Sequence, residues 1–143
     1  RIIIIKDCDI TVDSLEMSQY LRALTFSEEV EQQDATRRGD TARSFEAGLR
    51  TGTVTAQFRQ DFADNTVDEK LTDLLADTDG FTVVIKPTSA AVGAANPSYT
   101  ATMNLESYER FDGSDVGSEG LCTATFVLAR TTGDNAGFAR AVS

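Results

Sequence analysis

The sequence predicts a mainly β fold, a β-sandwich or barrel with one flanking α-helix, in a single domain that spans residues 1–143. Apolar and polar residues alternate over several long segments, which is the pattern of strands with one buried face. A single segment has helical spacing instead, and neither a linker nor an internal repeat divides the chain. At 143 residues the chain is long enough to bury a substantial core.

The first half of the chain predicts four strands, at Cys8–Val12, Leu15–Met17, Leu21–Gln32 and Gly48–Gln60. Within the third strand, Glu28 interrupts the alternation, so this strand either leaves the core there or carries a bulge. A polar insert, Gln33–Ser44, separates the third strand from the fourth and contains a small cluster of arginines. Its polarity is typical of an exposed loop.

The segment after Thr66 predicts the helix. Thr66 and Glu69 fit a capping box, in which each side chain accepts a hydrogen bond from the backbone N–H of the other residue. The apolar residues that follow at helical spacing form one stripe, made of Val67, Leu71, Leu74 and Leu75. We expect this stripe to cover the core of the sandwich or barrel.

The second half of the chain predicts three more strands, at Phe81–Lys86, Tyr99–Arg110 and Gly120–Arg130. An uncharged loop of small residues joins the first two of these. Pro87 cannot donate a ladder hydrogen bond and therefore ends its strand, while Asn96 followed by Pro97 favours a turn before the next strand. The last residues, about 131–143, are expected to form a flexible tail with little core of its own.

The composition argues against enzymatic chemistry. Histidine is absent, which removes the usual acid–base residue at neutral pH and excludes Ser-His-Asp and Cys-His sites. Cys8 and Cys122 match no metal or redox spacing, and we expect two small buried hydrophobic residues rather than a disulfide. The acidic clusters lack the spacing of a calcium-binding loop. We therefore expect no catalytic residue, no metal and no cofactor.

The charge of the chain argues against two further classes of function. With 23 acidic and 13 basic side chains, the formal net charge is −10. Binding to nucleic acid and to anionic lipid draws on lysine and arginine, so neither is expected here. A strongly acidic surface would instead keep a polyanion from adhering, although solubility alone also accounts for it.

The longer strands share one feature, a face of uncharged polar residues opposite the apolar face. These residues are Thr25, Ser27, Thr53, Thr55, Gln57, Thr102, Asn104, Thr123 and Thr125. In a lone monomer such a face is an ordinary solvated surface, because threonine favours strands. Long strands also leave edges that must be covered or paired. Closing several copies into a ring would pair the edges and turn the polar face into the wall of a wet channel.

Several segments of the chain together resemble one known family. They are the opening Cys8–Val12 with Leu15–Leu21, Gly39-Asp40-Thr41 with Arg43, the central strand Gly52–Asp61, the helix start Val67-Asp68, and the loop Lys86–Tyr99. In their order along the chain and in their residue sequence, these segments resemble the major tail tube proteins of long-tailed (siphovirus-type) bacteriophages, particularly those that infect actinobacteria. The resemblance runs over nearly the whole chain, and the loop matches best.

The resemblance implies a structural protein of the virion that forms hexameric rings stacked into a tube. Phage DNA would pass through the lumen into the host without specific binding, past the polar residues named above. The loop at about 33–44 would stack on the next ring, which makes Arg37, Arg38, Asp40 and Arg43 candidate inter-ring contacts. Other implied partners are tape-measure, tail-tip and tail-terminator proteins, with no membrane. Assembly would take place in the cytoplasm of the bacterial host.

A second class of function stays open, a non-catalytic binding module such as a sugar- or small-ligand-binding β-sandwich of a virion or cell surface. Sugar-binding surfaces commonly use exposed aromatic residues. Tryptophan is absent, and the tyrosines Tyr20, Tyr99 and Tyr108 form no obvious cluster in the sequence. The composition therefore weakens this alternative without excluding it.

Overall fold

In the computed structural model, which describes residues 8–77, 79–88, 90–111, 120–129 and 137–142, eight strands form one antiparallel sheet. The strand order is β2-β1-β5-β6-β7-β4-β3, and β8 pairs with the first residues of β6. The strands are β1 (Asp9–Val12), β2 (Leu15–Glu16), β3 (Leu21–Asp34), β4 (Phe45–Arg59), β5 (Phe81–Lys86), β6 (Ser98–Glu109), β7 (Leu121–Leu128) and β8 (Ala139–Ala141). One helix, α1 (Val67–Leu75), packs against β6. The predicted mainly β class with one flanking helix is confirmed.

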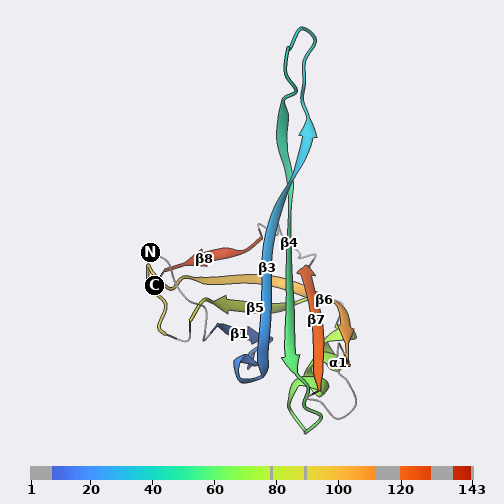
Figure 1. Ribbon diagram of the computed structural model, residues 1–143, viewed down its shortest axis with the longest axis vertical. Helices are drawn as coiled ribbons and strands as arrows, with labels where there is room; N and C mark the ends of the chain where they lie inside the picture. Colours follow the sequence, from blue (N-terminus) through green and yellow to red (C-terminus); the bar gives the residue numbers. More distant parts are fainter. Residues whose placement is uncertain (1–7, 78, 89, 112–119, 130–136, 143) are drawn as a thin grey trace.

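The sheet folds over itself, so that its two halves enclose the core. Figure 1 shows β3, β4 and β7 running along the long axis of the molecule and crossing β1, β5 and β6. Aromatic rings connect the crossing strands: Phe81 on β5 meets Phe126 on β7 at 5.8 Å between ring centroids, and Phe26 on β3 meets Tyr99 on β6 at 5.4 Å. This crossing is the orthogonal packing of sheets.

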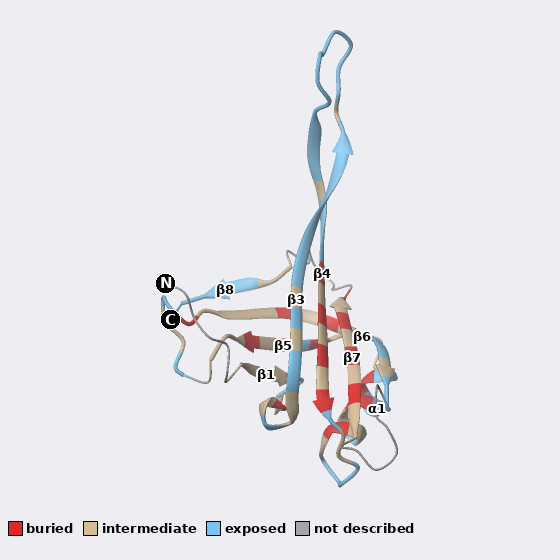
Figure 2. Ribbon diagram, in the orientation of Figure 1, coloured by how far each residue is buried: buried red, intermediate tan, exposed pale blue. Residues whose placement is uncertain are grey.

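Burial follows the predicted alternation along the central strands. Every second residue is buried from Gly52 to Phe58 in β4 and from Cys122 to Phe126 in β7, as the alternating colours in Figure 2 show. The largest fully buried side chains are those of Phe58, Phe126, Ile10, Met17, Leu71 and Met103. Of the two cysteines, Cys122 is buried and Cys8 is half-buried, and both are free thiols.

The helix begins where the sequence predicts, but its first turn is held differently. The expected capping box is wrong, because Thr66 makes no capping hydrogen bond and instead donates to the carbonyl oxygens of Ala63 and Asp61 at 2.6 and 3.1 Å. Glu69 accepts a bond at 2.9 Å from the backbone N–H of Asn65 rather than from Thr66. The backbone reason is a left-handed residue, Asn65 with φ of 60°, which turns the chain just before the helix.

The apolar stripe of the helix is narrower than predicted. Val67, Leu71 and Leu74 are buried against the core, whereas Leu75 is 42% exposed. Leu75 is the last helical residue, and its direction follows from the helical period, because Leu71 and Leu74 already occupy the face toward the sheet.

The C-terminal segment contributes more structure than the predicted tail. Ala139–Ala141 form β8, which pairs with β6 from Ser98 to Thr100. Phe138 packs its ring 4.3 Å from that of Phe26, between centroids, and lies against the core cluster. The sequence signal was weak because β8 has three residues, all exposed. Residues 130–136 lie outside the described part of the chain.

The loop between β5 and β6 is held by one buried amide. Asn96 is 8% exposed, and its Nδ2 donates to the carbonyl oxygens of Ala90, Ala91 and Thr88 at 2.8, 3.3 and 3.3 Å. Its Oδ1 accepts from the backbone N–H of Thr88 at 3.1 Å. The Asn96 side chain therefore adds bonds to the two backbone hydrogen bonds that the loop makes between Gly93 and Asn96.

Replacing Asn96 with alanine is expected to lower the free energy of unfolding by about 1–3 kcal/mol, because the backbone groups of Thr88, Ala90 and Ala91 lose the buried side chain that bonds them. Urea unfolding of the purified monomer measures this change. Asn96→Asp keeps the acceptor for Thr88 but removes the donors, so it should be destabilised in the same direction. An alanine variant as stable as the original chain would contradict this account of the loop.

Candidate functional site

The uncharged polar residues of the longer strands lie side by side on the face of the sheet opposite the core. Thr25 on β3 lies directly opposite Thr55 on β4, and Thr55 lies opposite Thr125 on β7. Two residues further along β3, Ser27 lies opposite Thr53. Directly opposite residues of an antiparallel pair point to the same face, so these hydroxyl groups form rows across three strands.

The remaining four predicted residues extend the same face. Gln57 lies opposite Thr123, and Asn104 on β6 lies opposite Val127, the neighbour of Thr53. Thr102 precedes Asn104 by two residues, and so shares its face of β6. All nine residues of this polar face are exposed or half-buried. The Oδ1 atom of Asn104 is shielded from solvent and has no hydrogen-bond partner among the described residues.

The polar face includes two residues that the sequence pattern missed. A register shift between Leu105 and Ser107 places Ser107 opposite Thr125 and Glu109 opposite Thr123. An uninterrupted alternation would have put Ser107 on the apolar face. Tyr108 could have indicated the bulge, because a large aromatic residue stands there at a position that strict alternation from Leu105 assigns to the polar face. The bulge turns Tyr108 toward the core.

The polar face offers hydrogen bonds but little charge. β7 contains no charged residue, and β3 contains none from Ala23 to Ser27. Such a surface can bind water and hydroxyl groups, but it provides no cationic anchor in its centre for phosphate. Among the described residues no group of three or more His, Cys, Asp or Glu side chains could hold a metal ion. No helix in the described ranges is long and apolar enough to cross a membrane.

The second feature of the molecule is a long hairpin that projects from the body. β4 pairs with β7 from Thr53 to Arg59, so beyond Ser27, which lies opposite Thr53, β3 and β4 pair only with each other, and every residue of β3 from there is exposed (Figures 1 and 2). Of the two alternatives at Glu28, the strand leaves the core there; the register shift lies further on, between Val30 and Gln32. β3 extends to Asp34 and so takes up the first two residues of the predicted insert, whereas β4 begins at Phe45, directly after the insert and three residues before the predicted strand start at Gly48.

The hairpin tip, residues 35–44, is ordered by short-range bonds. Asp34 accepts from the backbone N–H of Thr36 at 2.9 Å, and hydrogen bonds from the side chain and backbone of Thr36 lower the pKa of that carboxyl group. Asp40 accepts from the N–H of Arg37 at 2.7 Å across a turn. Arg43 reaches Asp34 at 3.8 Å, in an exposed ion pair. Of the predicted contact residues, Arg37 and Arg38 make no ion pair within the described part of the chain.

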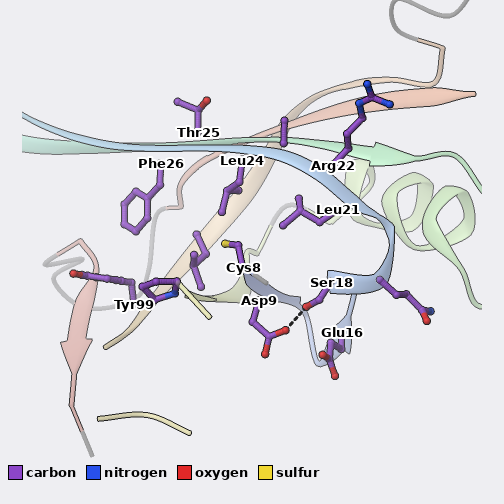
Figure 3. A pocket seen from close by; sticks show the side chains of 14 residues that line it. Cys8, Asp9, Glu16, Ser18, Leu21, Arg22, Leu24, Thr25, Phe26 and Tyr99 are labelled. Carbon is purple, nitrogen blue, oxygen red and sulfur yellow. Dashed lines mark hydrogen bonds between the residues drawn. The ribbon is translucent and has the colours of Figure 1, made fainter. Parts of the chain in front are cut away.

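The third feature is an open seam between the two ends of the sheet. β3 has no partner strand on its outer edge among the described residues, and a groove of about 990 Å³ separates it from β1 and β5. Figure 3 shows the groove, lined by Leu21, Leu24 and Phe26 of β3 and by Tyr99 across from them. The seam therefore leaves a long, unpaired strand edge beside apolar side chains.

The floor of the seam carries one ionised group with strong partners. The Ser18 hydroxyl donates to Asp9 Oδ1 at 2.5 Å, drawn as a dashed line in Figure 3, and Lys86 Nζ lies 3.4 Å from Asp9 Oδ2. The bond from Ser18 lowers the pKa of Asp9 against the opposing effect of burial, and Lys86 lowers it further. Asp9 therefore stays ionised at neutral pH and fixes the start of β1 to β5.

Comparisons with solved structures identify similar folds. One is a chain in the virion of a native gene transfer agent (GTA) particle, with a TM-score of 0.68 and 17% identity, covering 96% of this chain and 95% of that one. Another belongs to the tail of an empty GTA particle of C6 symmetry, with a TM-score of 0.62 and 17% identity over 87% of this chain and 82% of that one.

A third similar chain belongs to the sheath-tube complex, in the extended state, of an extracellular contractile injection system, PVC. Its TM-score is 0.62 at 10% identity, covering 99% of this chain and 92% of that one. At identities of 10–17%, these likenesses establish a shared fold. No protein-family model matches the sequence, and no curated protein matches it either.

Proposed function

We propose that this chain is the major tail tube subunit of a phage or phage-like particle. In this role, copies of the chain assemble into hexameric rings, and the rings stack into a tube that conducts DNA. The observation that carries the proposal is the combination, in one small fold, of an uncharged polar sheet face with an unpaired edge strand beside it. The shared fold with chains of a GTA tail and of a sheath-tube complex supports it.

Ring formation follows from the free edge of β3. A long exposed edge carries unpaired backbone N–H and C=O groups, and a neighbouring copy can satisfy them. A head-to-tail contact of this kind closes when the rotation between copies divides a full turn. The C6 symmetry of the similar GTA tail makes six copies the expected number.

The lumen would be formed by the polar face. Six copies carry a formal charge of six times −10, or −60, which repels DNA from the wall in general. The rows of hydroxyl groups that include Thr25, Thr55 and Thr125 would hydrate the wall of the lumen without binding phosphate. DNA would therefore slide through without specific binding, and the lumen-facing residues would be those of the polar face.

The hairpin would join successive rings. It is exposed, has no core of its own, and extends along the long axis of the body, which suits contact with a second copy above (Figure 1). Arg37, Arg38, Asp40 and Arg43 at its tip are the proposed inter-ring contacts. A tail also needs a tape-measure, a tail tip and a terminator, so proteins of these kinds are the proposed further partners, with the virion tail as the location.

Cysteine labelling of assembled tubes tests the proposed lumen. In a Cys8→Ser background, Thr125→Cys is expected to react with a small maleimide in tubes but not with a maleimide attached to a protein wider than the channel. Leu75→Cys is the matched control, because α1 lies on the core side of the sheet, away from the polar face. In tubes it should react with both reagents. Labelling of Thr125→Cys by the large reagent would show that the polar face lies outside.

The groove at the seam favours a second candidate, a small-ligand-binding module of a virion or cell surface. It is large enough for a ligand, and its lining combines apolar side chains with the charged residues Asp9, Glu16 and Arg22. A glycan array and a small-ligand screen on the monomer test this function. A ligand that binds the groove, combined with the absence of any assembly, would favour the module over the tube subunit.

A further inference from the structure

We propose that the end of the body opposite the hairpin is the receptor for the hairpin tip of a second copy. This base patch consists of Phe62, Asp64, Glu69, Asp73 and Phe111. The inference rests on the proposed function and deepens it, because it assigns the surface that the tip contacts in the next ring. Figure 1 places the loop before α1 at the end of the long axis farthest from the hairpin tip.

The base patch exposes two large aromatic side chains that make little contact with the core. The rings of Phe62 and Phe111 lie 5.8 Å apart between centroids and are tilted by 45° to each other, yet the residues are 59% and 71% exposed. The hairpin has a matching feature, because Phe45 and Leu49 are 54% and 76% exposed. A soluble chain rarely leaves large apolar side chains exposed in pairs unless another surface covers them.

The two ends also carry opposite charge. The tip, residues 35–44, has three arginines and one aspartate, for a net charge of +2. The segment that ends the body, residues 61–77, has six acidic residues and one lysine, for a net charge of −5. Because the chain as a whole is acidic, opposite charge alone does not single out this end of the body, and the exposed aromatic pair formed by Phe62 and Phe111 distinguishes it from other acidic surfaces.

Some charged side chains of α1 already have partners elsewhere in the same chain. Asp68 accepts from Tyr108 Oη at 2.7 Å and lies 3.6 Å from Arg110 Nε. Lys70 is paired with Asp13 at 2.8 Å. These pairs fasten the helix to the strands, and neither Asp68 nor Lys70 belongs to the base patch.

Glu69 Oε2 accepts from the backbone N–H of Asn65 at 2.9 Å, which leaves its other carboxylate oxygen and the carboxylate of Asp73 to receive a guanidinium group. Glu69 and Asp73 lie four residues apart on the exposed side of α1, and both line a cleft of about 190 Å³ together with Leu15, Asn65 and Lys70. Two carboxylates at this spacing can accept charge-assisted bonds from an arginine fork. Arg37 and Arg38 are the arginines at the tip that have no ion pair in the described part of the chain.

The occupant must be a second copy rather than the same chain. Tip and base lie at opposite ends of the long axis, separated by the full length of the paired strands (Figure 1). A contact between different patches on identical chains is heterologous, and when translation accompanies it, the contact repeats without closing. Stacked rings are the assembly that such a contact builds.

A charge-swap experiment on the full chain tests the inference. R37E/R38E and E69R/D73R are each expected to form rings but to raise the protein concentration needed for tubes by about tenfold or more. Combining all four substitutions in one chain should restore tubes. The matched control combines R37E/R38E with D79R/E106R, which reverses two exposed acidic residues outside the segment 61–77 and should not restore tubes. Electron microscopy and analytical ultracentrifugation distinguish rings from tubes.

The outcomes separate this inference from the function on which it rests. Tubes that form normally with E69R/D73R, while R37E/R38E prevents them, would overturn the base patch but leave the tube function standing. Failure of the fourfold variant to recover, with rings intact, would also overturn it. An original chain that forms neither rings nor tubes, even when seeded by a tail tip, would contradict the proposed function, and the inference with it.

Discussion

Replacing residues 30–50 with Asn-Gly is expected to abolish tube formation while leaving a folded subunit that still forms rings. Glu29 lies directly opposite Thr51, so a two-residue turn can close the shortened hairpin in register. The removed residues are almost all exposed and add nothing to the core, so the free energy of unfolding should change little. Electron microscopy measures assembly, and thermal unfolding followed by circular dichroism measures the fold.

The control for this deletion is Thr41→Ala, a small change at the exposed tip that removes neither charge nor apolar surface. It should assemble as the original chain does. Normal tubes from the shortened chain would contradict the proposed stacking role of the hairpin. Loss of the folded state on shortening would contradict the conclusion that the hairpin is energetically separate from the body.

Phe126→Ala is expected to lower the free energy of unfolding by about 3–5 kcal/mol, out of the 5–15 kcal/mol typical of a domain. Phe126 is fully buried, and its ring meets that of Phe81 edge-on at 5.8 Å. Its loss would leave a cavity at the crossing of β5 and β7, where the two halves of the sheet enclose the core. Urea unfolding measures the change, and tubes should fail with the fold.

The matched control is Phe111→Ala, the same chemical change at a residue that is 71% exposed. Its free energy of unfolding should stay within about 0.5 kcal/mol of the original. In the monomer, therefore, one phenylalanine is structural and the other is not. Equal effects at the two positions would contradict the assignment of the core.

The alternation of apolar and polar residues predicted most of the fold, because each central strand buries one face and exposes the other. That is why the strands around Val54, Met103 and Phe126 and the buried strand Phe81–Lys86 were predictable. Thr66 also predicted the helix start correctly, although the capping bonds were not those expected. Helix position depends on local spacing, whereas the capping bonds depend on backbone angles such as that of Asn65, which spacing does not encode.

Features that depend on the pairing of strands distant in the sequence could not be predicted from the sequence. The polar residues of the hairpin are compatible with either a loose loop or two paired strands, and only the register of β3 with β4 decides. The bulge before Ser107 and the short β8 strand were not predicted for the same reason. The polar face could be listed from alternation, but the seam, the base patch and the free edge of β3 required the folded arrangement.

Cryo-electron microscopy of the concentrated full chain tests the central claim most directly. We predict hollow tubes of stacked six-fold rings, with Thr55 and Thr125 facing the lumen and the hairpin of each ring contacting the next. Tubes with these threonines on the outer surface would contradict the proposed lumen. A chain that stays monomeric at every concentration, and does not join tubes seeded by a tail tip, would contradict the tube function itself.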